Sequence, residues 1–446
     1  MKGITITRAA AICGGKLSCK LENDLELGKV VIDSRAIEAG DFFVAYKGER
    51  VDGNDYITAA LDKGAACCLA SRVPEGETRP VIVADDVQKA LELICAEYRR
   101  SLSIPIIGIT GSVGKTTAKE MTASVLSQRY NVLKTDGNLN NQIGVPMTIS
   151  RIEPWHEAAV VEMGISGFGE MSDLARVARP TAALFTVIGH AHLEFLHDQD
   201  GVYRAKTEML DFMPADAPVI VNGDDERLAK MRRENLITCG VGKNCALRAE
   251  NISTDGKSEF FDIVYQGRRI PVMVPAYGRH MITAALEGAA VGFALGLSDE
   301  EVAAGIAGYK ILGRRGIVTD TGRISIVDDS YNANPDSMRS SIDSLAELPG
   351  RKVCILGDML EMGADAPKMH YDLGAYAAEK GMSAVLCCGE LSRETARGAG
   401  NIGRHYDSVE ELIAALHETI QTGDRVLVKA SRGMHFERIA EALKEL

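Results

Sequence analysis

Short apolar runs alternate with amphipathic stretches through the middle of the chain. The runs "IPIIGIT", "AAVVEMG" and "AALFTVIG" are typical of buried strands. Between Thr116 and Tyr130, Met121 and Val125 fall one turn apart on one face of an expected helix. Because strands that alternate with helices form parallel sheets covered by helices, this part is predicted to be an α/β domain.

The same rhythm returns in the last third of the chain. The runs "ISIVDD", "KVCILGD", "SAVLCCG" and "RVLVKAS" are separated by segments of helical length, which predicts a second, independent α/β domain. The polar, glycine-bearing stretch "KILGRRG" is the expected hinge. Ahead of the middle domain, short strands and turns around "VVIDSRAIEAGDFFVAYKGERVDGNDY" precede a helical stretch from Val87 to Arg100. We therefore predict three domains, at residues 1–98, 99–313 and 314–446.

Length, charge and cysteine usage narrow the classes of protein. A chain of 446 residues suits about three domains of roughly 150 residues each. The net charge of −12 disfavours a nucleic-acid or anionic-membrane partner, because such partners are held by basic surface. The cysteines form no C-x-x-C repeat, which indicates reduced thiols rather than a zinc ribbon or a disulfide framework. We expect a cytoplasmic monomer without a nucleic-acid or membrane partner.

The stretch "GITGSVGKTTAKE" places a glycine-rich turn between a strand and a helix. Such a turn aims backbone N–H groups and a helix N-terminus at an anion. Gly111 and Gly114 allow the backbone to approach phosphates, Lys115 offers a positive charge, and Thr116 offers a hydroxyl to Mg²⁺. Ile109 replaces the first glycine of the usual P-loop, but it falls on the strand, where a β-branched residue fits. The pattern predicts a nucleoside-triphosphate site.

Several candidate residues keep two interpretations. Glu162 ends an apolar strand, where ligands of α/β sheets collect, so it is a metal ligand or a solvated rim residue. His190, His192 and His197 form either a zinc cluster or hydrogen-bonded rim positions. By spacing alone, Lys206 is an ordinary surface lysine on a helix.

The hinge carries basic residues at positions 314 and 315. A domain closure could carry an arginine to a transferring phosphate, an effect worth roughly 10³ to 10⁵ in rate elsewhere. The alternative is a solvated turn. Other function classes are a GTPase-like switch, a zinc hydrolase and a non-enzymatic scaffold. The switch is disfavoured because no N-K-x-D tetrad follows the loop.

A set of longer motifs resembles the Mur ligase family. In chain order they are "TGSVGKTT", "GNLNNQIGVPMT", "VEMG", "AHLE", "AKTEM", "VNGDD", "VDDSYNANPDSM" and "LGDMLEMG". The second and seventh resemble the branch that adds D-alanyl-D-alanine to UDP-N-acetylmuramoyl-tripeptide, and "DSR…GDFFVAYKGERVDG" is similar to its UDP-sugar-binding domain. The resemblance covers essentially the whole chain.

The resemblance implies a fold and an activity. The implied fold is a small N-terminal α/β UDP-substrate domain, a central P-loop domain with a parallel sheet, and a C-terminal Rossmann-like α/β domain. The implied reaction is ATP-dependent ligation of UDP-MurNAc-tripeptide and D-Ala-D-Ala through an acyl phosphate, a step of peptidoglycan synthesis. The alternatives are a Mur-type or folylpolyglutamate-type ligase that adds another amino acid, and a diverged paralogue with altered nucleotide binding.

Site residues carry over from the same resemblance. The catalytic set is Lys115, Glu162, His192, Lys206 and Arg314. The nucleotide-binding set is Thr110, Gly111, Ser112, Val113, Gly114, Lys115, Thr116, Thr117, Asp329, Tyr331, Asn332 and Asn334. The UDP moiety is assigned to Ser34, Arg35 and Lys47. Two Mg²⁺ ions are assigned to Thr116, Glu162, His192 and Lys206, the last as a carbamate, because a carbamate offers oxygen ligands whereas an ammonium would be repelled.

Five positions depart from the family pattern. Met281, Ala284 and Val187 stand where asparagine is usual, Asn54 where histidine is frequent, and Ala430 where glycine is frequent. In the family, the positions of Met281 and Ala284 are those of the usual adenine contacts. We expect ATP use to survive with altered affinity, because the phosphate and metal positions are unchanged.

Overall fold

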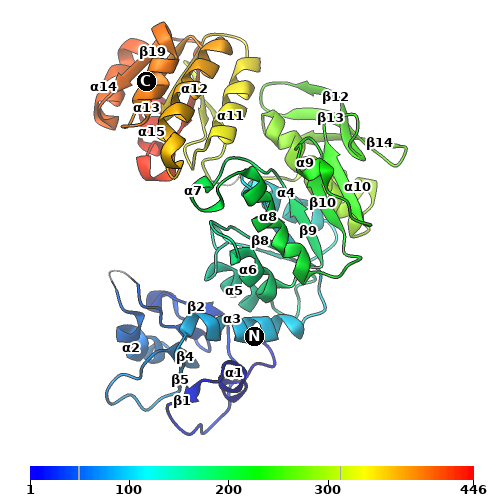
Figure 1. Ribbon diagram of the computed structural model, residues 1–446, viewed down its shortest axis with the longest axis vertical. Coiled ribbons are helices and arrows are strands. Elements are labelled where there is room, and N and C mark those ends of the chain that lie inside the picture. Colours follow the sequence, from blue (N-terminus) through cyan, green and yellow to red (C-terminus); the bar gives the residue numbers. More distant parts are fainter. Residues whose placement is uncertain (49–50, 312) are drawn as a thin grey trace.

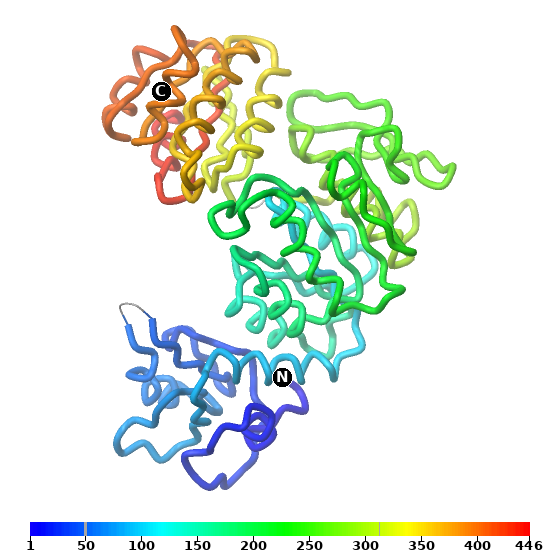
Figure 2. The backbone as a smooth tube through the Cα atoms, in the orientation of Figure 1, coloured from blue at the N-terminus to red at the C-terminus, as the bar shows by residue number. Residues whose placement is uncertain are grey.

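Three β-sheets follow one another along an elongated, curved molecule (Figure 1). The computed structural model describes residues 1–48, 51–311 and 313–446, and these form sheets of five, nine and six strands. The N-terminal and C-terminal units lie at opposite ends of the chain trace, with the central unit between them (Figure 2). Each sheet is combined with helices, which confirms the predicted α/β class with three domains.

The N-terminal unit is a small sheet of short strands in the order β1-β5-β4-β3-β2. Its elements are α1 (Ile6–Cys13), β1 (Lys16–Leu17), β2 (Val30–Val31), η1 (Ser34–Ala36), β3 (Phe42–Val44), η2 (Gly53–Tyr56), α2 (Ile57–Asp62), β4 (Cys67–Ala70), β5 (Val81–Val83) and α3 (Val87–Arg100). Strands β3 and β4 are buried along their whole length, which explains their unbroken apolar runs. Helix α3 has the predicted bounds, and Asp86 caps it by accepting from the backbone N–H of Lys89.

Helix α3 joins the first two units. Leu91, Ile94 and Tyr98 pack in one hydrophobic cluster with residues of the central sheet and of the helices on that face. The helix therefore runs through the predicted boundary after residue 98 and ends at Arg100. The two domain boundaries proposed from the sequence stay predictions.

The central unit has the strand order β14-β13-β12-β11-β10-β9-β6-β8-β7. Its elements are β6 (Ile106–Thr110), α4 (Lys115–Leu126), β7 (Val132–Lys134), α5 (Gly144–Ser150), β8 (Ala158–Glu162), α6 (Glu170–Ala178), β9 (Ala182–Phe185), α7 (Leu193–Leu196), α8 (Gln199–Thr207), η3 (Glu208–Phe212), β10 (Val219–Asn222), η4 (Leu228–Lys230), β11 (Leu236–Gly240), β12 (Leu247–Thr254), β13 (Glu259–Tyr265), β14 (Arg268–Val274), α9 (Arg279–Ala294) and α10 (Asp299–Ala307). Strands β6 to β12 pair in parallel, whereas β12, β13 and β14 form an antiparallel extension that the sequence pattern did not predict.

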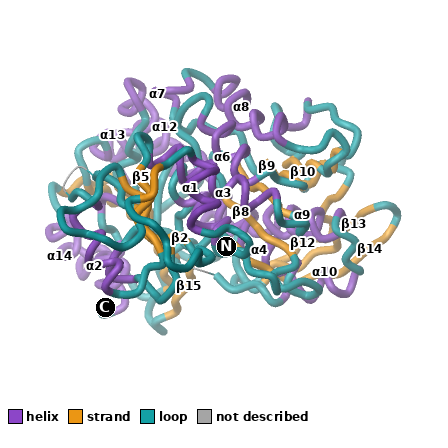
Figure 3. The backbone as a smooth tube through the Cα atoms, turned by 90° about the horizontal axis from the view of Figure 1, so that it is seen from below, coloured by secondary structure: helices purple, strands orange, loops and turns teal. Residues whose placement is uncertain are grey.

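Successive residues of the central strands face two different helix layers. Ile106 belongs to the cluster of α3, α5, α6 and α8, whereas Ile107 belongs to the cluster of α4, α9 and α10. Figure 3 shows strands of this sheet lying among helices. Because both faces are covered, the strands appear in the sequence as continuous apolar runs.

The C-terminal unit has the strand order β15-β16-β20-β17-β18-β19, parallel except for the edge strand β15. Its elements are β15 (Ile317–Asp320), β16 (Ser325–Asp328), α11 (Pro335–Glu347), β17 (Lys352–Gly357), η5 (Gly363–Asp365), α12 (Ala366–Glu379), β18 (Ala384–Cys388), α13 (Ser392–Gly398), η6 (Gly400–Ile402), β19 (Gly403–Tyr406), α14 (Val409–Thr419), β20 (Arg425–Lys429), η7 (Arg432–Met434) and α15 (Glu437–Lys444). Cys354 and Leu356 face one core cluster, while Val353 and Ile355 face the other. This two-sided covering is the doubly wound arrangement expected for a Rossmann-like domain.

Two further expectations concern membrane spans and thiols. Among the residues that the structure describes, no helix combines the length and the apolar character needed to cross a membrane. All ten cysteines are free, and eight of them are buried.

Helix α9 carries a carboxyl group into the core of the central unit. Glu287 is 2% exposed, its Oε1 atom has no hydrogen-bond partner, and burial raises its pKa to about 8. In the unfolded chain this carboxyl group loses its proton near pH 4.5. Between about pH 4.5 and 8 the folded state therefore keeps a proton that the unfolded state has lost. Stability is therefore expected to fall as the pH rises from about 4.5 to about 8.

Replacing Glu287 by methionine is expected to stabilise the central unit at pH 8, by about 2 kcal/mol, and to have a smaller effect at pH 5. The measurement is urea unfolding at both pH values, followed by the fluorescence of Trp155, the single tryptophan, which lies in the same unit. The exposed Glu234 provides the matched control, Glu234→Met. Equal shifts at both pH values would contradict this account of Glu287.

Candidate active site

The glycine-rich turn between β6 and α4 packs against the residues that follow β9. A Cβ atom on Gly111 would lie 1.9 Å from Oγ1 of Thr186, so only glycine fits there. Gly114 precedes α4 with φ of +83°, a conformation that favours glycine. Lys115 turns back over the loop, where its ammonium donates to the carbonyl oxygen of Gly111 at 2.8 Å. This strand, turn and helix confirm the local structure predicted from the sequence, although α4 ends at Leu126 rather than Tyr130.

Two hydroxyls of the loop tie it to neighbouring segments. Thr110 donates to the carbonyl oxygen of Met163 at 2.8 Å, and Oγ of Ser112 accepts from the backbone N–H of Gly189 at 2.9 Å. Thr116 and Thr117 lie half-buried in the first turn of α4. The loop is thereby fixed between the carboxyl ends of β6, β8 and β9, with its backbone N–H groups at the N-terminus of α4.

Glu162 presents one buried oxygen without a partner. The side chain is 2% exposed at the end of β8, and its Oε1 atom accepts from Nδ2 of Asn140 at 2.8 Å. Its Oε2 atom has no hydrogen bond and lies 3.8 Å from Nζ of Lys119. A buried carboxylate oxygen of this kind is suited to a hard cation. The solvated-rim interpretation of Glu162 is wrong.

Lys206 is buried, so the expectation of an ordinary surface lysine is wrong. The side chain is 1% exposed on α8, where Val202 and Ala205 also face the core. Burial and, secondly, the charge of Lys115 lower its pKa well below the usual value of 10.5. Within the described residues, no ion pair with a carboxylate offsets these effects. Both effects disfavour the ammonium form of Lys206 compared with that of an exposed lysine.

His192 lies beside the two lysines. Its backbone has φ of +57° at the start of α7, and its ring Nδ1 is 3.7 Å from Oε2 of Glu361, a residue of the C-terminal unit. Burial lowers its pKa, and the charges of Lys206 and Lys115 lower it further, which favours the neutral imidazole. Electrostatic coupling also links Lys115 to Glu162. Four of the predicted catalytic groups therefore gather at the carboxyl edge of the central sheet.

The other two histidines of the segment turn to different partners. His190 places its ring Nδ1 3.3 Å from Oδ1 of Asp336, whereas the ring of His197 lies 6.4 Å from that of Phe168, centroid to centroid. In the part of the chain that the structure describes, no cluster of three or more His, Cys, Asp or Glu residues has metal-binding geometry. The arrangement of the three histidines does not support a zinc cluster.

Residues predicted for the nucleotide pocket occupy the start of the C-terminal unit. Asp329 accepts from Nζ of Lys429 at 2.5 Å and from the hydroxyl of Ser341 at 2.7 Å. The carbonyl oxygen of Asn332 also accepts from Lys429, at 3.1 Å. Asn334 caps α11. These three residues therefore hold the segment between β16 and α11 in place.

The two hinge arginines, Arg314 and Arg315, point to different partners, and the one nearer the loop is not the one assigned from the sequence. The guanidinium of Arg314 donates to Asp328 and to Glu441, both at 2.7 Å, within the C-terminal unit. The guanidinium of Arg315 instead lies 3.7 Å from the centre of the Tyr331 ring. The charge of Arg315, not that of Arg314, lowers the pKa of Lys115. The structure therefore brings Arg315 toward the loop and does not bring Arg314 there.

The residues assigned to the UDP moiety lie in the N-terminal unit, apart from the loop (Figure 1). Ser34 and Arg35 form η1, and the exposed Arg35 pairs with Asp33 at 2.8 Å. Lys47 is exposed. The structure does not bring these side chains together with the four predicted catalytic groups.

The departures from the family pattern are accommodated inside the protein. Met281 and Ala284 are each 3% exposed in the core on α9. The carbonyl oxygen of Val187 accepts from the backbone N–H of Ser112 at 2.7 Å. In addition, Asn54 binds Asp52 and Ser71, and Ala430 is fully buried.

Sequence reasoning did not single out Asn140 or Asp336, and of the two hinge arginines it assigned Arg314 rather than Arg315. Asn140 lies within the motif "GNLNNQIGVPMT", and its side chain fixes the orientation of Glu162. Its position in an unusual run of asparagines is the signal that could have identified it. No comparable local signal separates Arg315 from its neighbour Arg314.

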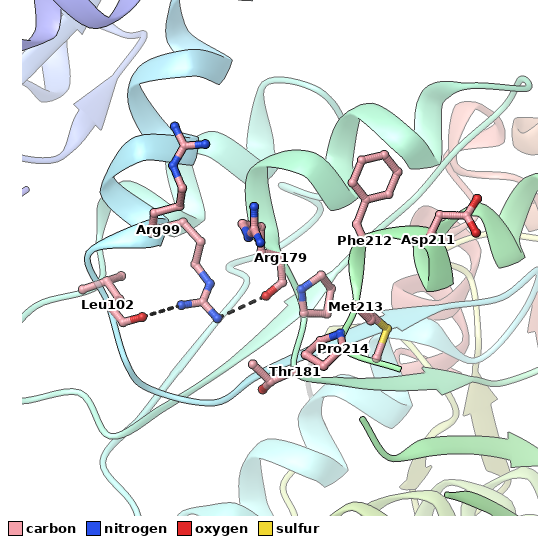
Figure 4. A pocket seen from close by; sticks show the side chains of 10 residues that line it. Arg99, Leu102, Arg179, Thr181, Asp211, Phe212, Met213 and Pro214 are labelled. Carbon is pink, nitrogen blue, oxygen red and sulfur yellow. Dashed lines mark hydrogen bonds between the residues drawn. The ribbon is translucent and has the colours of Figure 1, made fainter. Parts of the chain in front are cut away.

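A cavity of about 570 Å³ lies at the opposite end of the same strands (Figure 4). Arg99 is 5% exposed beside it and donates to the carbonyl oxygens of Ala178, Leu102 and Arg179 at 2.8, 2.8 and 3.1 Å. Burial and the nearby charge of Arg179 lower the pKa of Arg99 to about 10. Arg99 therefore caps the C-terminus of α6 by donating to the carbonyl oxygens of Ala178 and Arg179.

Family models match most of the chain. "Mur ligase family, catalytic domain" matches residues 26–107, "Mur ligase middle domain" matches 109–292, and "Mur ligase, glutamate ligase domain" matches 313–432. UDP-N-acetylmuramoyl-tripeptide–D-alanyl-D-alanine ligase of Bacillus subtilis is 35% identical, over 99% of this chain and 98% of that protein. The enzyme of the same name from Escherichia coli is 34% identical, over 100% and 99%.

Solved structures of Mur ligases also resemble this chain over nearly its whole length. MurF from Acinetobacter baumannii matches with a TM-score of 0.92 and 28% identity, covering 99% of both chains. MurF ligase from Thermotoga maritima in complex with ADP matches with a TM-score of 0.84 and 27% identity, over 94% of this chain and 97% of that one. With these relatives matched over nearly their whole length, the chain belongs to the Mur ligase family.

Proposed function

We propose that this protein is an ATP-dependent ligase that joins D-alanyl-D-alanine to UDP-N-acetylmuramoyl-tripeptide, forming the pentapeptide precursor of peptidoglycan. The observation that carries the proposal is the gathering of Lys115, Glu162, His192 and Lys206 beside a phosphate-binding loop. The full-length relatives with that name support the choice of substrates.

The proposed reaction brings anionic groups together, which explains why positive charge is needed at the site of a protein with a net charge of −12. The terminal carboxylate of the tripeptide attacks the γ-phosphorus of ATP, and ADP leaves. The amine of D-Ala-D-Ala then attacks the acyl phosphate, loses a proton and expels phosphate. The loop N–H groups and Lys115 hold the transferring phosphate in the orientation that this attack needs.

The residues present fit magnesium. Glu162 offers a buried Oε2 atom without a hydrogen bond, and Asn140 fixes its orientation. Thr116, His192 and Lys206, the last as a carbamate, complete the proposed ligand set for two ions. When bound, Mg²⁺ neutralises charge on the phosphates and on the attacking carboxylate.

The carbamate on Lys206 follows from the burial of this residue. Because its pKa is lowered well below 10.5, the neutral amine is available to attack carbon dioxide. The Nζ–C bond forms, a proton passes to solvent, and the product carries two oxygen atoms. The carbamate would thereby convert a repulsive position into a cation ligand.

Remaining assignments belong to the same proposal. Asp329, Tyr331, Asn332 and Asn334 contribute to the nucleotide pocket, and Ser34, Arg35 and Lys47 bind the UDP moiety. Arg315 takes the role of the hinge arginine that was first assigned to Arg314, because its charge acts on Lys115. The protein acts in the cytoplasm as a monomer.

The test is a ligation assay with the purified protein. UDP-MurNAc-tripeptide, D-Ala-D-Ala and Mg-ATP are expected to yield the pentapeptide with release of phosphate. Single D-alanine and L-glutamate in place of the dipeptide are expected to react poorly, and preference for either one would instead indicate a related ligase. In the same assay, Arg315→Ala is expected to impair catalysis more than Arg314→Ala. No product from a folded sample with any amine would refute the proposal.

A further inference from the structure

A carboxylate of the C-terminal unit reaches the loop that follows β9. Asp336 lies in the first turn of α11, and its Oδ2 atom accepts from the backbone N–H of His190 at 2.9 Å. Its Oδ1 atom is 3.3 Å from Nδ1 of the same histidine. Both oxygens therefore engage a single residue of the central unit, across the junction of the two units.

A glycine makes this contact possible. A Cβ atom on Gly189 would lie 2.2 Å from Oδ2 of Asp336, whereas the next residue it would meet, Ser112, is 3.3 Å away at its Cβ atom. The backbone of Gly189 does not have a positive φ angle, so alanine is allowed there by conformation. Close approach of Asp336 is thus the feature that requires glycine.

The contacted loop is also bound to the phosphate loop. The backbone N–H of Gly189 donates to Oγ of Ser112 at 2.9 Å, and the backbone N–H of Ser112 donates to the carbonyl oxygen of Val187 at 2.7 Å. Three residues after Gly189 in the chain comes His192, beside Lys206 and Lys115. One short segment therefore joins the C-terminal unit, the phosphate loop and the catalytic histidine.

We propose that Asp336 is a positioning residue, which holds the C-terminal unit against the loop at 187–190 and thereby aligns the two halves of the nucleotide site. Asn334 caps the same helix and fixes the direction of its first turn. The inference builds on the proposed ATP site, because part of the proposed nucleotide pocket, Asp329, Tyr331, Asn332 and Asn334, lies on the C-terminal unit. Loss of the contacts between Asp336 and His190 weakens ATP binding, because the C-terminal unit is then no longer held against the loop.

The test is a double-mutant cycle between the two sides of the contact. Nucleotide affinity of Gly189→Ala, Asp336→Ala and the double variant is measured by calorimetry with a non-hydrolysable ATP analogue. Each single change is expected to weaken binding about ten-fold, which corresponds to about 1.4 kcal/mol. In the Asp336→Ala background, Gly189→Ala is expected to add less than a factor of two, because the atom it would clash with is gone.

Matched controls separate positioning from general stability. Asp343 lies on the same helix but pairs with Tyr376 and Lys380 inside the C-terminal unit, so Asp343→Ala is expected to leave affinity unchanged. Asp336→Asn keeps an acceptor for the backbone N–H and is expected to recover part of the affinity. Small-angle scattering of Asp336→Ala is expected to show a more open molecule with an unchanged melting temperature.

Several outcomes would overturn the inference. They are full additivity of the two substitutions, equal effects of Asp336→Ala and Asp343→Ala, and an unchanged scattering curve with unchanged affinity. Because binding and scattering do not require turnover, an enzyme that binds ATP but makes no pentapeptide would refute the proposed function alone.

Discussion

Replacing Lys206 by alanine is expected to reduce ligation by roughly 10² to 10³ or more, because the change removes the position that we propose carries a carbamate. Affinity for the UDP substrate is expected to change little, because the residues proposed to bind it, Ser34, Arg35 and Lys47, lie in another unit. The measurement is the initial rate of phosphate release and pentapeptide formation, with folding checked by thermal unfolding.

Small acids provide the decisive control for Lys206. Added formate or acetate is expected to restore part of the activity of Lys206→Ala, because it can place carboxylate oxygens where the carbamate oxygens would lie. The exposed Lys230 provides the matched variant, Lys230→Ala, which is expected to behave as the unchanged protein with or without acid. An active Lys206→Ala would remove this lysine from the site, and absence of rescue would argue against the carbamate.

The second large effect is expected for Glu162→Gln. The amide has nearly the same size and keeps an oxygen that can accept from Asn140, but it loses the negative charge of the buried Oε2 atom. We expect kcat to fall by roughly 10² and the Mg²⁺ concentration for half-maximal rate to rise at least about ten-fold. The measurement is a magnesium titration at saturating substrates.

A neighbouring glutamate makes the comparison specific. Glu157 is exposed just before the same strand, where it accepts from the backbone N–H of Asn131. Glu157→Gln is expected to leave the magnesium dependence unchanged. An unaltered titration curve for Glu162→Gln would show that the buried oxygen does not face the metal.

Elements with strong local patterns were predicted well. The phosphate loop, with the strand before it and the helix after it, was identified because glycine spacing and a buried strand are local properties of the chain. The helix from Val87 to Arg100 was predicted to the residue, since Asp86 caps it and its apolar face is continuous. The antiparallel strands β12 to β14 were missed, because the polar residues on their exposed side weaken the apolar signal.

The site itself was only partly accessible from the sequence. Lys206 has the spacing of a surface lysine, and only its resemblance to a family position placed it in the site. Its burial follows from the packing of α8 on the central sheet. Arg314 and Arg315 are adjacent in the hinge, and their different directions depend on carboxylates at Asp328 and Glu441 that come from distant parts of the chain.

By itself the sequence determined that the chain forms α/β domains, that a phosphate-binding turn lies at the end of one strand, and that the long motifs are those of the Mur ligases. These properties depend on residues close together in the chain. Tertiary structure alone decided that Glu162 keeps a buried oxygen without a hydrogen bond, that the charge of Lys115 acts on the buried Lys206, and that Asp336 meets the loop at Gly189. The physical reason is that burial, pKa and contact between units depend on which distant segments pack together, and no local pattern contains that information.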